Sequence, residues 1–375
     1  MIFSTFPQKD ATLYEATRSM NTGLDAILEL TKHGQTSSSL LASGSIFNTR
    51  ILLQFDLSEI SSSITAGTIG ADAKYYLNLY TCEANEVTSE YAITAHPVSE
   101  SWTMGTGKYF NDPSTTDGCS WKYRTNETDG TEWTQTGFAT GTTGSDNAFQ
   151  SEPGGGTFYT SSVSSQSFSN ESSDVRMDVT DIVKQWISGS IDNHGFLIKR
   201  SGSGATSQEF DTTAYGSLKF FSSDTSTVYP PRLEAAWDDS SQVTSSLSEL
   251  TEDDILLYLK NNRGTYKQDA KAKFRVTGRE RFPVATFATK SEALTVKHLP
   301  TSSYYSVKDA HSEETIIPFD TGSTKISCDS SGNFFKLWMS GLQPERYYRF
   351  VFRVDRDGGN RIEYFDDNFI FKVVR

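Results

Sequence analysis

Few residues of the chain have the types and spacing that enzyme chemistry requires. The histidines are scattered along the sequence at His33, His96, His194, His298 and His311. A serine or cysteine nucleophile needs a base beside it, and no Gly-x-Ser-x-Gly turn marks such a serine. The three cysteines, Cys82, Cys119 and Cys328, include no Cys-x-x-Cys pair of the kind that binds zinc. The sequence therefore predicts a protein that is not an enzyme and that carries no cofactor.

Carboxylates are numerous enough to do chemistry, with 47 Asp and Glu in 375 residues. Five of them fall at predicted strand or helix ends, where oxygen ligands often hold calcium: Asp10, Asp25, Asp56, Asp178 and Asp181. Their spacing is not that of an EF-hand loop, and hydrogen bonds to the backbone explain Asp at caps and turns equally well. A structural calcium ion is therefore an alternative to capping, and nothing singles out two acids as a glycosidase pair.

Aromatic residues interrupt a polar region, residues 105–173, that is rich in Gly, Ser, Thr, Asn and Asp. Flat rings can stack on sugars, or they can pack a loop against a sandwich or a neighbouring subunit, and packing is the favoured interpretation. The triple glycine at 154–156 is interpreted as a flexible loop. The candidate contacts with a partner protein or a glycan are four aromatic residues of this region and two C-terminal arginines: Trp121, Tyr123, Trp133, Phe158, Arg349 and Arg353.

The elements that would position these residues are mostly strands. Short strand-like runs are separated by turn signals, and in the runs at 50–56 and 74–80 the apolar residues lie mostly two apart, the pattern of a half-buried strand. They lie at 26–30, 50–56, 74–80, 91–98, 195–199, 218–221, 232–237, 272–276, 304–307, 333–339, 347–354 and 368–374. One helix is predicted over 178–189, because its apolar residues, Trp186 among them, share one face. The expected fold is all-β: a jelly-roll-like β-sandwich with one short helix, followed by a second, smaller immunoglobulin-like β-sandwich.

A polar stretch after the last strand of the first sandwich indicates a domain boundary. Residues 1–240 are predicted to form the first domain, residues 241–254 a linker, and residues 255–375 the second domain. No stretch approaches the roughly 18 apolar residues of a membrane span, and the N-terminus lacks the pattern of a signal peptide. No membrane partner is therefore predicted.

The formal charge of −13 is unevenly distributed. Residues 1–250 hold 14 Lys and Arg against 30 Asp and Glu, a net charge of −16. Residues 251–375 hold 20 against 17, a net charge of +3. Phosphate backbones are bound by clustered Lys and Arg, and the sequence contains no dense basic run. A nucleic-acid partner is therefore not predicted.

The first part of the chain resembles the DNRLRE-type β-sandwich domain, a carbohydrate-binding-module-like family also seen in structural proteins of tailed phages. The resemblance rests on spaced segments that include RILLQFDL at 50–57 and NHGFLIK at 193–199. The other segments, in family order, are 7–15, 21–25, 95–102, 117–121, 178–189 and 231–234. Together they span nearly all of residues 5–238, whereas no family is indicated for the second part.

The resemblance implies a binding or structural role and no catalysis. The leading hypothesis is a non-enzymatic structural protein of a tailed-phage virion, in the capsid decoration, neck or tail. Its expected partners are other virion proteins and further copies of the same chain, with the polar loops of 105–173 becoming ordered on assembly. The alternative is a carbohydrate-binding module of an adsorption apparatus or of a polysaccharide-acting protein, which would bind a surface glycan.

Overall fold

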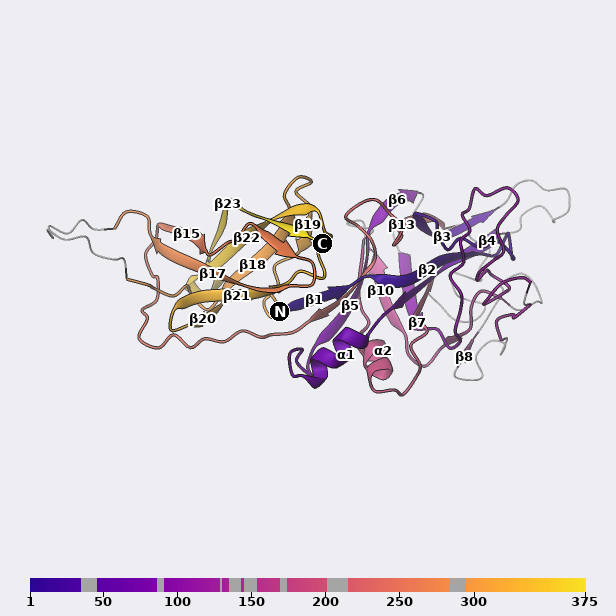
Figure 1. Ribbon diagram of the computed structural model, residues 1–375, viewed down its shortest axis with the longest axis horizontal. Coiled ribbons are helices and arrows are strands. Elements are labelled where there is room, and N and C mark those ends of the chain that lie inside the picture. The colour runs from indigo at the N-terminus through magenta and orange to yellow at the C-terminus, as the bar shows by residue number, and fades with distance from the viewer. Residues whose placement is uncertain are drawn as a thin grey trace. The chain divides into compact units, whose positions relative to one another are not determined.

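The computed structural model describes residues 1–34, 46–85, 91–128, 130–134, 143–144, 154–168, 174–200, 215–283 and 295–375. Strands make up most of the regular structure, and α1 and α2 are the α-helices of these described ranges (Figure 1). The chain divides into two compact units. The N-terminal unit comprises residues 5–66 and 74–234, and the C-terminal unit comprises 1–4, 67–73 and 235–375. The predicted all-β fold of two sandwiches is confirmed.

The units follow other boundaries than the predicted ones. The chain passes between them four times, at residues 4/5, 66/67, 73/74 and 234/235. Residues 241–254, expected to be a linker, belong to the C-terminal unit. There the Val243 N–H donates to the Cys328 carbonyl (3.0 Å), and the N–H of fully buried Leu250 donates to the His298 carbonyl (2.8 Å). A polar segment held by backbone hydrogen bonds has no apolar period, so its sequence looks like a linker.

Two sheets and a two-stranded ladder form the N-terminal unit. The larger sheet has the order β10-β7-β12-β4-β3-β13-β6, with β2 paired to β4. The smaller sheet contains β14, β5 and β11 in that order, and β8 pairs with β9. The strands are β2 (Pro7–Tyr14), β3 (Ile27–Gly34), β4 (Ile46–Phe55), β5 (Lys74–Leu79), β6 (Thr81–Asn85), β7 (Tyr91–Pro97), β8 (Thr143–Gly144), β9 (Phe158–Tyr159), β10 (Ser164–Phe168), β11 (Val175–Asp178), β12 (Phe196–Arg200), β13 (Gly216–Phe221) and β14 (Arg232–Ala236).

Side chains on both faces of the larger sheet are buried. Ile51, Leu52 and Leu53 follow one another in β4, and each is 0 % exposed. Strand β12 is likewise buried at all five positions. Because successive side chains of a strand point to opposite faces, each face of this sheet must be covered.

Helix α2 (Thr180–Ile187) covers part of one face. Its Trp186 is 6 % exposed, and its ring packs edge-on against Phe196 of β12 with centroids 4.6 Å apart. The Asp178 carboxylate accepts a hydrogen bond from the Thr180 N–H (3.0 Å), and Gly189 follows the helix at φ 71°. The helix predicted over 178–189 is therefore present in slightly shorter form.

The structure also contains α1 (Ser58–Thr65), which the sequence pattern did not indicate. Five of its eight residues are Ser or Thr, whose helix propensity is low. Ile60 is its buried residue, so one side chain anchors the whole helix. Asp56 supports its start by accepting hydrogen bonds from the N–H and the hydroxyl of Ser58, both at 2.9 Å.

The C-terminal unit is a sandwich of two sheets. One has the order β15-β17-β21-β20, and the other β16-β23-β22-β18-β19, in which β16 runs parallel to β23. Its strands are β15 (Ile255–Lys260), β16 (Thr265–Lys267), β17 (Lys271–Glu280), β18 (Ser303–Asp309), β19 (Thr315–Ile317), β20 (Ser327–Asp329), β21 (Gly332–Trp338), β22 (Arg346–Arg356) and β23 (Arg361–Val374), with the short 3-10 helix η1 (Asp357–Gly359) between the last two.

Phenylalanine rings join the two sheets of this sandwich. Phe274 of β17 and Phe335 of β21 stack at 5.2 Å, and both contact Phe350 of β22, at 4.7 and 5.0 Å. Phe350 in turn stacks on Phe371 of β23 at 4.7 Å. Offset and edge-on aromatic pairs of this kind add to the free energy of burial, so this cluster is the core of the unit.

The first residues of the chain complete the C-terminal unit. Phe3, in β1 (Ile2–Thr5), packs edge-on against Trp338 with ring centroids 5.2 Å apart. A Cβ added to Gly341 would lie 2.7 Å from the Cβ of Ser4, so the backbone of this unit closes tightly over the segment. The unit is therefore built from distant parts of the sequence.

Replacing Trp186 tests the packing of α2. Trp186→Ala is expected to lower the free energy of unfolding of the N-terminal unit by about 3–5 kcal/mol, because it leaves a cavity beside Phe196. Urea titration followed by circular dichroism measures the change. Lys184→Ala, an exposed change on the same helix, is the matched control and is expected to shift stability by about 0.5 kcal/mol or less. Equal effects of the two variants would contradict the proposed packing.

Candidate functional site

The connection between β7 and β10 covers the second face of the larger sheet. Trp121 and Trp133 of this connection are 0 % and 1 % exposed, and both belong to one apolar cluster with Leu52 and Leu197 of the sheet. The other members are Ala11, Leu13, Val98, Trp102, Cys119 and Phe158. Trp121, Trp133 and Phe158 were candidate contacts with a glycan or partner, and the structure places them in this core instead. These three aromatic residues of 105–173 are therefore packed against the sheet, while residues 129, 135–142, 145–153 and 169–173 lie outside the described residues.

A buried arginine fixes this cover to the sheet. Arg50 of β4 is 1 % exposed, and its Nη1 donates to the Gly155 carbonyl at 2.8 Å. Its guanidinium lies 5.1 Å from the ring centroid of Trp121 and 5.8 Å from that of Phe158. The hydrogen bond and the two aromatic faces offset part of the cost of burying the cation.

The triple glycine is a close-packed segment and not the flexible loop that its composition suggested. Gly155 and Gly156 adopt φ of 80° and 86°, a region that residues with a Cβ rarely enter. A Cβ on Gly155 would lie 2.5 Å from Nη1 of Arg50, and one on Gly156 would lie 2.5 Å from Cδ1 of Leu197. Glycine is required here because the backbone itself contacts the buried side chains.

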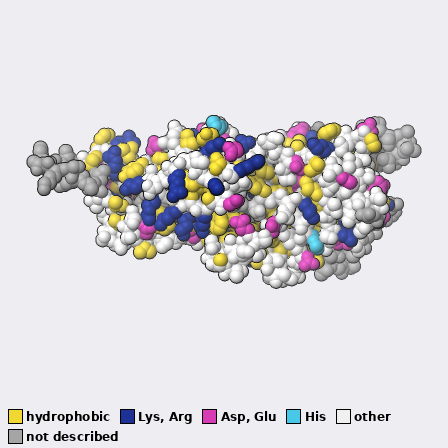
Figure 2. Space-filling model, viewed as in Figure 1, with side chains coloured by type: hydrophobic (Ala, Val, Ile, Leu, Met, Phe, Trp, Pro, Cys, Tyr) yellow, Lys and Arg dark blue, Asp and Glu magenta, His cyan; other side chains and the backbone are white. Residues whose placement is uncertain are grey.

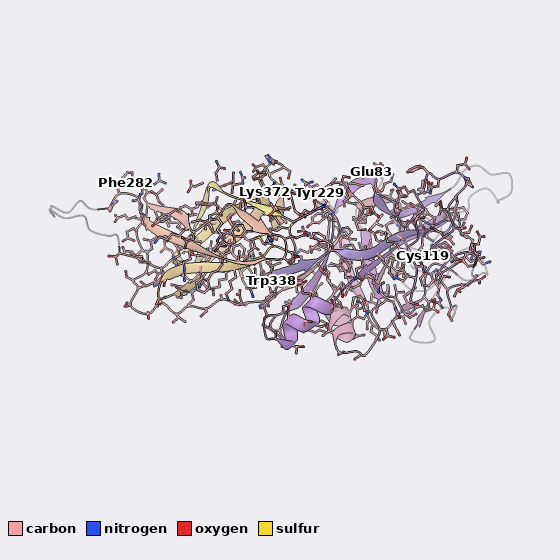
Figure 3. All side chains as sticks on the ribbon, viewed as in Figure 1. Glu83, Cys119, Tyr229, Phe282, Trp338 and Lys372 are labelled. Atoms are coloured by element: carbon pink, nitrogen blue, oxygen red, sulfur yellow. The ribbon has the colours of Figure 1, made fainter. Side chains whose placement is uncertain are left out.

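Asn21 holds the other half of the cover. Its side chain is buried, and its Nδ2 donates to the carbonyls of Met104 (2.6 Å) and Cys119 (2.8 Å). Its Oδ1 accepts from the N–H groups of Gly23 (3.2 Å) and Gly107 (2.8 Å). One amide thus ties the β2–β3 connection to both ends of the 104–119 loop; Figure 3 labels Cys119 at this place.

This loop presents two exposed aromatic side chains. Tyr109 is 58 % exposed and Phe110 is 76 % exposed, and we call residues 108–111 the aromatic tip. The Tyr109 N–H donates to Asp25 (3.2 Å), and the Tyr109 ring contacts Tyr14 at 5.0 Å between centroids. Sequence reasoning missed these residues because an exposed and a buried aromatic look alike in a polar loop.

Tyr123 is the one aromatic candidate of the sequence that is not fully buried. Its ring lies beside Nζ of Lys122, 5.2 Å from the centroid, and its N–H donates to the Ser120 hydroxyl at 3.1 Å. It sits in a short ladder with Glu132, which also pairs with Lys122. The Tyr123 side chain is therefore half-buried at the surface, whereas Trp121 and Trp133 lie in the core.

Both candidate arginines lie on the outer face of β22 and pair with carboxylates of the same chain. Arg349 contacts Glu313 and, at 3.1 Å, Asp366. Arg353 makes a bidentate pair with Asp355, from Nε at 2.7 Å and from Nη2 at 2.6 Å. Their charges are balanced within the unit, so neither arginine is a free cation for a partner.

Exposed apolar residues surround these arginines. In the ladder between β22 and β23, Arg349 lies opposite Ile370 and Arg353 lies opposite Tyr364. Tyr364, Ile370, Ile362 and Tyr347 are all more than 40 % exposed. We call this surface the β22–β23 face. Tyr and Arg set among apolar residues are the side chains that dominate the energetics of protein interfaces.

The predicted carboxylate ligands do not converge in the described ranges. Asp56 and Asp178 accept hydrogen bonds at the starts of α1 and α2. Asp10 is buried and accepts from the N–H and hydroxyl of Ser223, at 2.6 and 3.0 Å. Burial outweighs these hydrogen bonds and raises the pKa of Asp10 to about 6. No group of three or more His, Cys, Asp or Glu that could hold a metal ion occurs among the described residues.

The histidines and cysteines occupy separate environments. His96 is buried, with its ring nitrogens near the Tyr159 carbonyl and the Thr94 hydroxyl, both at 3.2 Å. The side chain of His33 lies outside the described residues. Burial raises the pKa of the Cys119 thiol and of the Cys328 thiol, which disfavours the reactive thiolate at both positions.

Within the described ranges, neither α-helix has the length and apolar character needed to cross a membrane. Comparisons of the chain with protein-family models and with curated proteins found no match. The aromatic tip and the β22–β23 face are therefore defined by the geometry of this chain alone.

Gly155→Ala tests the close approach of the loop to Arg50. The variant is expected to lose about 2–4 kcal/mol of stability, from the unfavourable φ and from the clash with Nη1. Gly189→Ala is the matched control, because Gly189 has a similar φ of 71° but nothing within 4 Å of its added Cβ. The control is expected to lose about 1–2 kcal/mol. Urea titration of both variants gives the difference, and equal losses would rule out a contribution from the contact.

Asp10 is expected to make stability depend on pH. Because its pKa is raised from an ordinary 3.8 to about 6, the folded state binds the proton more tightly than the unfolded state does. Stability therefore falls as the pH rises from about 4 to about 6, by roughly 3 kcal/mol for this group. Asp10→Asn should remove that part of the profile in urea titrations between pH 4 and pH 7. Parallel profiles of the two proteins would contradict the assignment.

Proposed function

We propose that the protein is a non-enzymatic structural component of a tailed-phage virion, a capsid decoration or an accessory piece of the neck or tail. It acts through contacts with other virion proteins and with further copies of itself. The proposal includes membership of residues 1–240 in the DNRLRE-type β-sandwich domains, on the strength of the segments described above. The observation that carries it is the aromatic tip, which exposes two large rings on a fixed backbone.

The aromatic tip has the properties of a preorganised protein contact. The N–H of Leu24 donates to the Gly107 carbonyl (3.0 Å), and the N–H of Asn111 donates to the Lys108 carbonyl (3.1 Å). Together with Asn21, these bonds hold the loop in one conformation. Because the loop is already ordered, binding of a partner over Phe110 would cost little conformational entropy. Most of the free energy gained by burying Phe110 would then contribute to affinity.

The β22–β23 face supports the same role in the C-terminal unit. Its two arginines are held by carboxylates, and its exposed tyrosines and isoleucines lie beside them. A surface of neutralised charge with apolar residues loses little solvation free energy when a protein covers it. Each unit thus presents its own surface suited to a neighbouring subunit.

Carbohydrate binding is the second candidate function, and the aromatic tip is also the observation that favours it. Tyr109 and Phe110 present exposed rings, and a flat ring can stack on the apolar face of a pyranose. Tyr123 is a further surface ring of the same loop region. In this alternative the chain is a binding module of an adsorption apparatus or of a polysaccharide-acting protein.

Quantitative mass spectrometry of purified particles tests the proposed function. We expect the chain at a fixed number of copies per particle, in a ratio to the major capsid protein set by the particle's symmetry. Absence from purified particles would overturn the proposal. Specific retention of the purified full chain on a glycan array, together with that absence, would establish the alternative.

Phe110→Ala tests the aromatic tip directly. Loss of a central aromatic contact is expected to reduce incorporation into particles about tenfold or more, without changing the melting temperature of the free protein. Phe282→Ala is the matched control, because Phe282 is 74 % exposed and lies in the other unit. Incorporation of both variants at wild-type level would exclude the aromatic tip as a virion contact, whereas loss of glycan retention alone would assign it to a sugar.

A further inference from the structure

One sheet face of the C-terminal unit carries a cluster of cations that the sequence does not reveal. In β17, alternate residues from Lys271 to Arg279 point outward, while Phe274 and Val276 between them point into the core. The neighbouring strands add one lysine each, since Lys260 of β15 pairs with Arg275 and Lys336 of β21 pairs with Lys273. We call this set the basic face: Lys260, Lys271, Lys273, Arg275, Arg279 and Lys336. Figure 2 shows dark-blue side chains gathered over β17 and β21.

The positive charge of the basic face is only partly balanced. Asp329 pairs with Arg275 (2.8 Å) and Lys273 (3.0 Å), and Asp239 lies 3.6 Å from Lys336. Within the described ranges, none of the other three cations forms an ion pair with a carboxylate. Six cations against two carboxylates leave four positive charges on one face of a four-stranded sheet.

The cations also repel one another. Burial and the neighbouring charge of Lys336 lower the pKa of Lys271, although Asp239 acts in the opposite direction. Three of the cations surround one ring, with Lys273 at 3.7 Å, Arg275 at 5.6 Å and Lys336 at 6.0 Å from the centroid of Phe334. An anionic surface placed here would relieve this repulsion, and aromatic side chains would support it.

The same chain provides a unit whose net charge has the required sign. The N-terminal unit holds 14 Lys and Arg against 26 Asp and Glu, a net charge of −12. The C-terminal unit as a whole holds 20 against 21, so its basic face stands out from a nearly neutral unit. The basic face already binds a carboxylate in the geometry of Asp329, which contacts a guanidinium with both oxygens.

We infer that the basic face docks on the acidic N-terminal unit of a second copy of this chain. The contact joins two different surfaces, so it is heterologous and can repeat from one copy to the next, closing into a ring if the rotation allows. The inference rests on the proposed function, because a virion component is present in many copies. The docking residues are then the cations of the basic face, whereas the candidate contacts Arg349 and Arg353 are balanced by carboxylates of their own unit.

Self-association of the purified full chain tests the inference. Sedimentation velocity and static light scattering are run at protein concentrations up to about 1 mM. The tested variant is Lys260→Glu/Lys271→Glu, which reverses two cations that lack carboxylate partners. The matched control is Lys267→Glu/Arg375→Glu, which changes the net charge equally at exposed cations of the C-terminal unit outside the basic face. The glutamine versions of both pairs serve if a glutamate variant has a lowered melting temperature.

We expect the wild-type chain to associate at low salt and to lose about tenfold in association constant when salt rises from about 50 to 300 mM. The tested variant should associate at least about tenfold more weakly than the control at low salt. A wild-type chain that stays monomeric throughout, or variants that behave alike, would overturn the inference. The inference would also be overturned, in favour of a polyanionic ligand, if a monomeric wild-type chain were retained on a heparin column and the tested variant were not. The proposed function would survive each of these results if particle mass spectrometry still finds the chain.

Discussion

The larger sheet of the N-terminal unit has apolar side chains on both faces, and most of the remaining architecture follows from covering them. A sheet with one solvent-exposed face needs a covering layer on its other face only, whereas this sheet needs a covering layer on each face. Helix α2 covers part of one face through Trp186. The long connection between β7 and β10 covers the other, and therefore it contains three tryptophans in an otherwise polar sequence. Arg50 is tolerated in the middle of this second core because a glycine carbonyl and two rings surround it.

The strands were the most predictable feature of the sequence. Each of the twelve apolar runs lies within or overlaps an observed strand, because short apolar runs bounded by turn residues are a local signal of strands. Helix α2 was equally visible from its apolar face. Helix α1 and the segment 241–254 were not predictable, since one is stabilised by a single buried Ile60 and the other by backbone hydrogen bonds. The division into two units depends on which distant segments pack together, and no local pattern encodes that.

The surfaces were harder to predict than the fold. Exposure of an aromatic residue is a tertiary property, so Phe110 and Trp121 could not be told apart in a polar loop. Arg349 pairs with Asp366 of the neighbouring strand, which only the fold brings near, and Arg353 pairs with Asp355 two residues along its own strand. The basic face could not be predicted either, because its residues are distributed over separate parts of the sequence. Its cations alternate with core residues along β17 and are shared among three strands, so no basic run exists in the sequence.

The four passages of the chain between units govern the order in which the protein can fold during its synthesis. Phe3 packs against Trp338, so 335 residues separate two rings that meet in one core. A ribosome adding about 5–20 residues per second needs roughly 20–70 s to make that interval. For that time Phe3 lacks the ring that it packs against, although the Trp237 N–H can already donate to the Met1 carbonyl (3.0 Å) within the same unit. Phe3 must therefore stay accessible until β21 is produced, and a chain that stops before β21 would lack the Phe3–Trp338 contact.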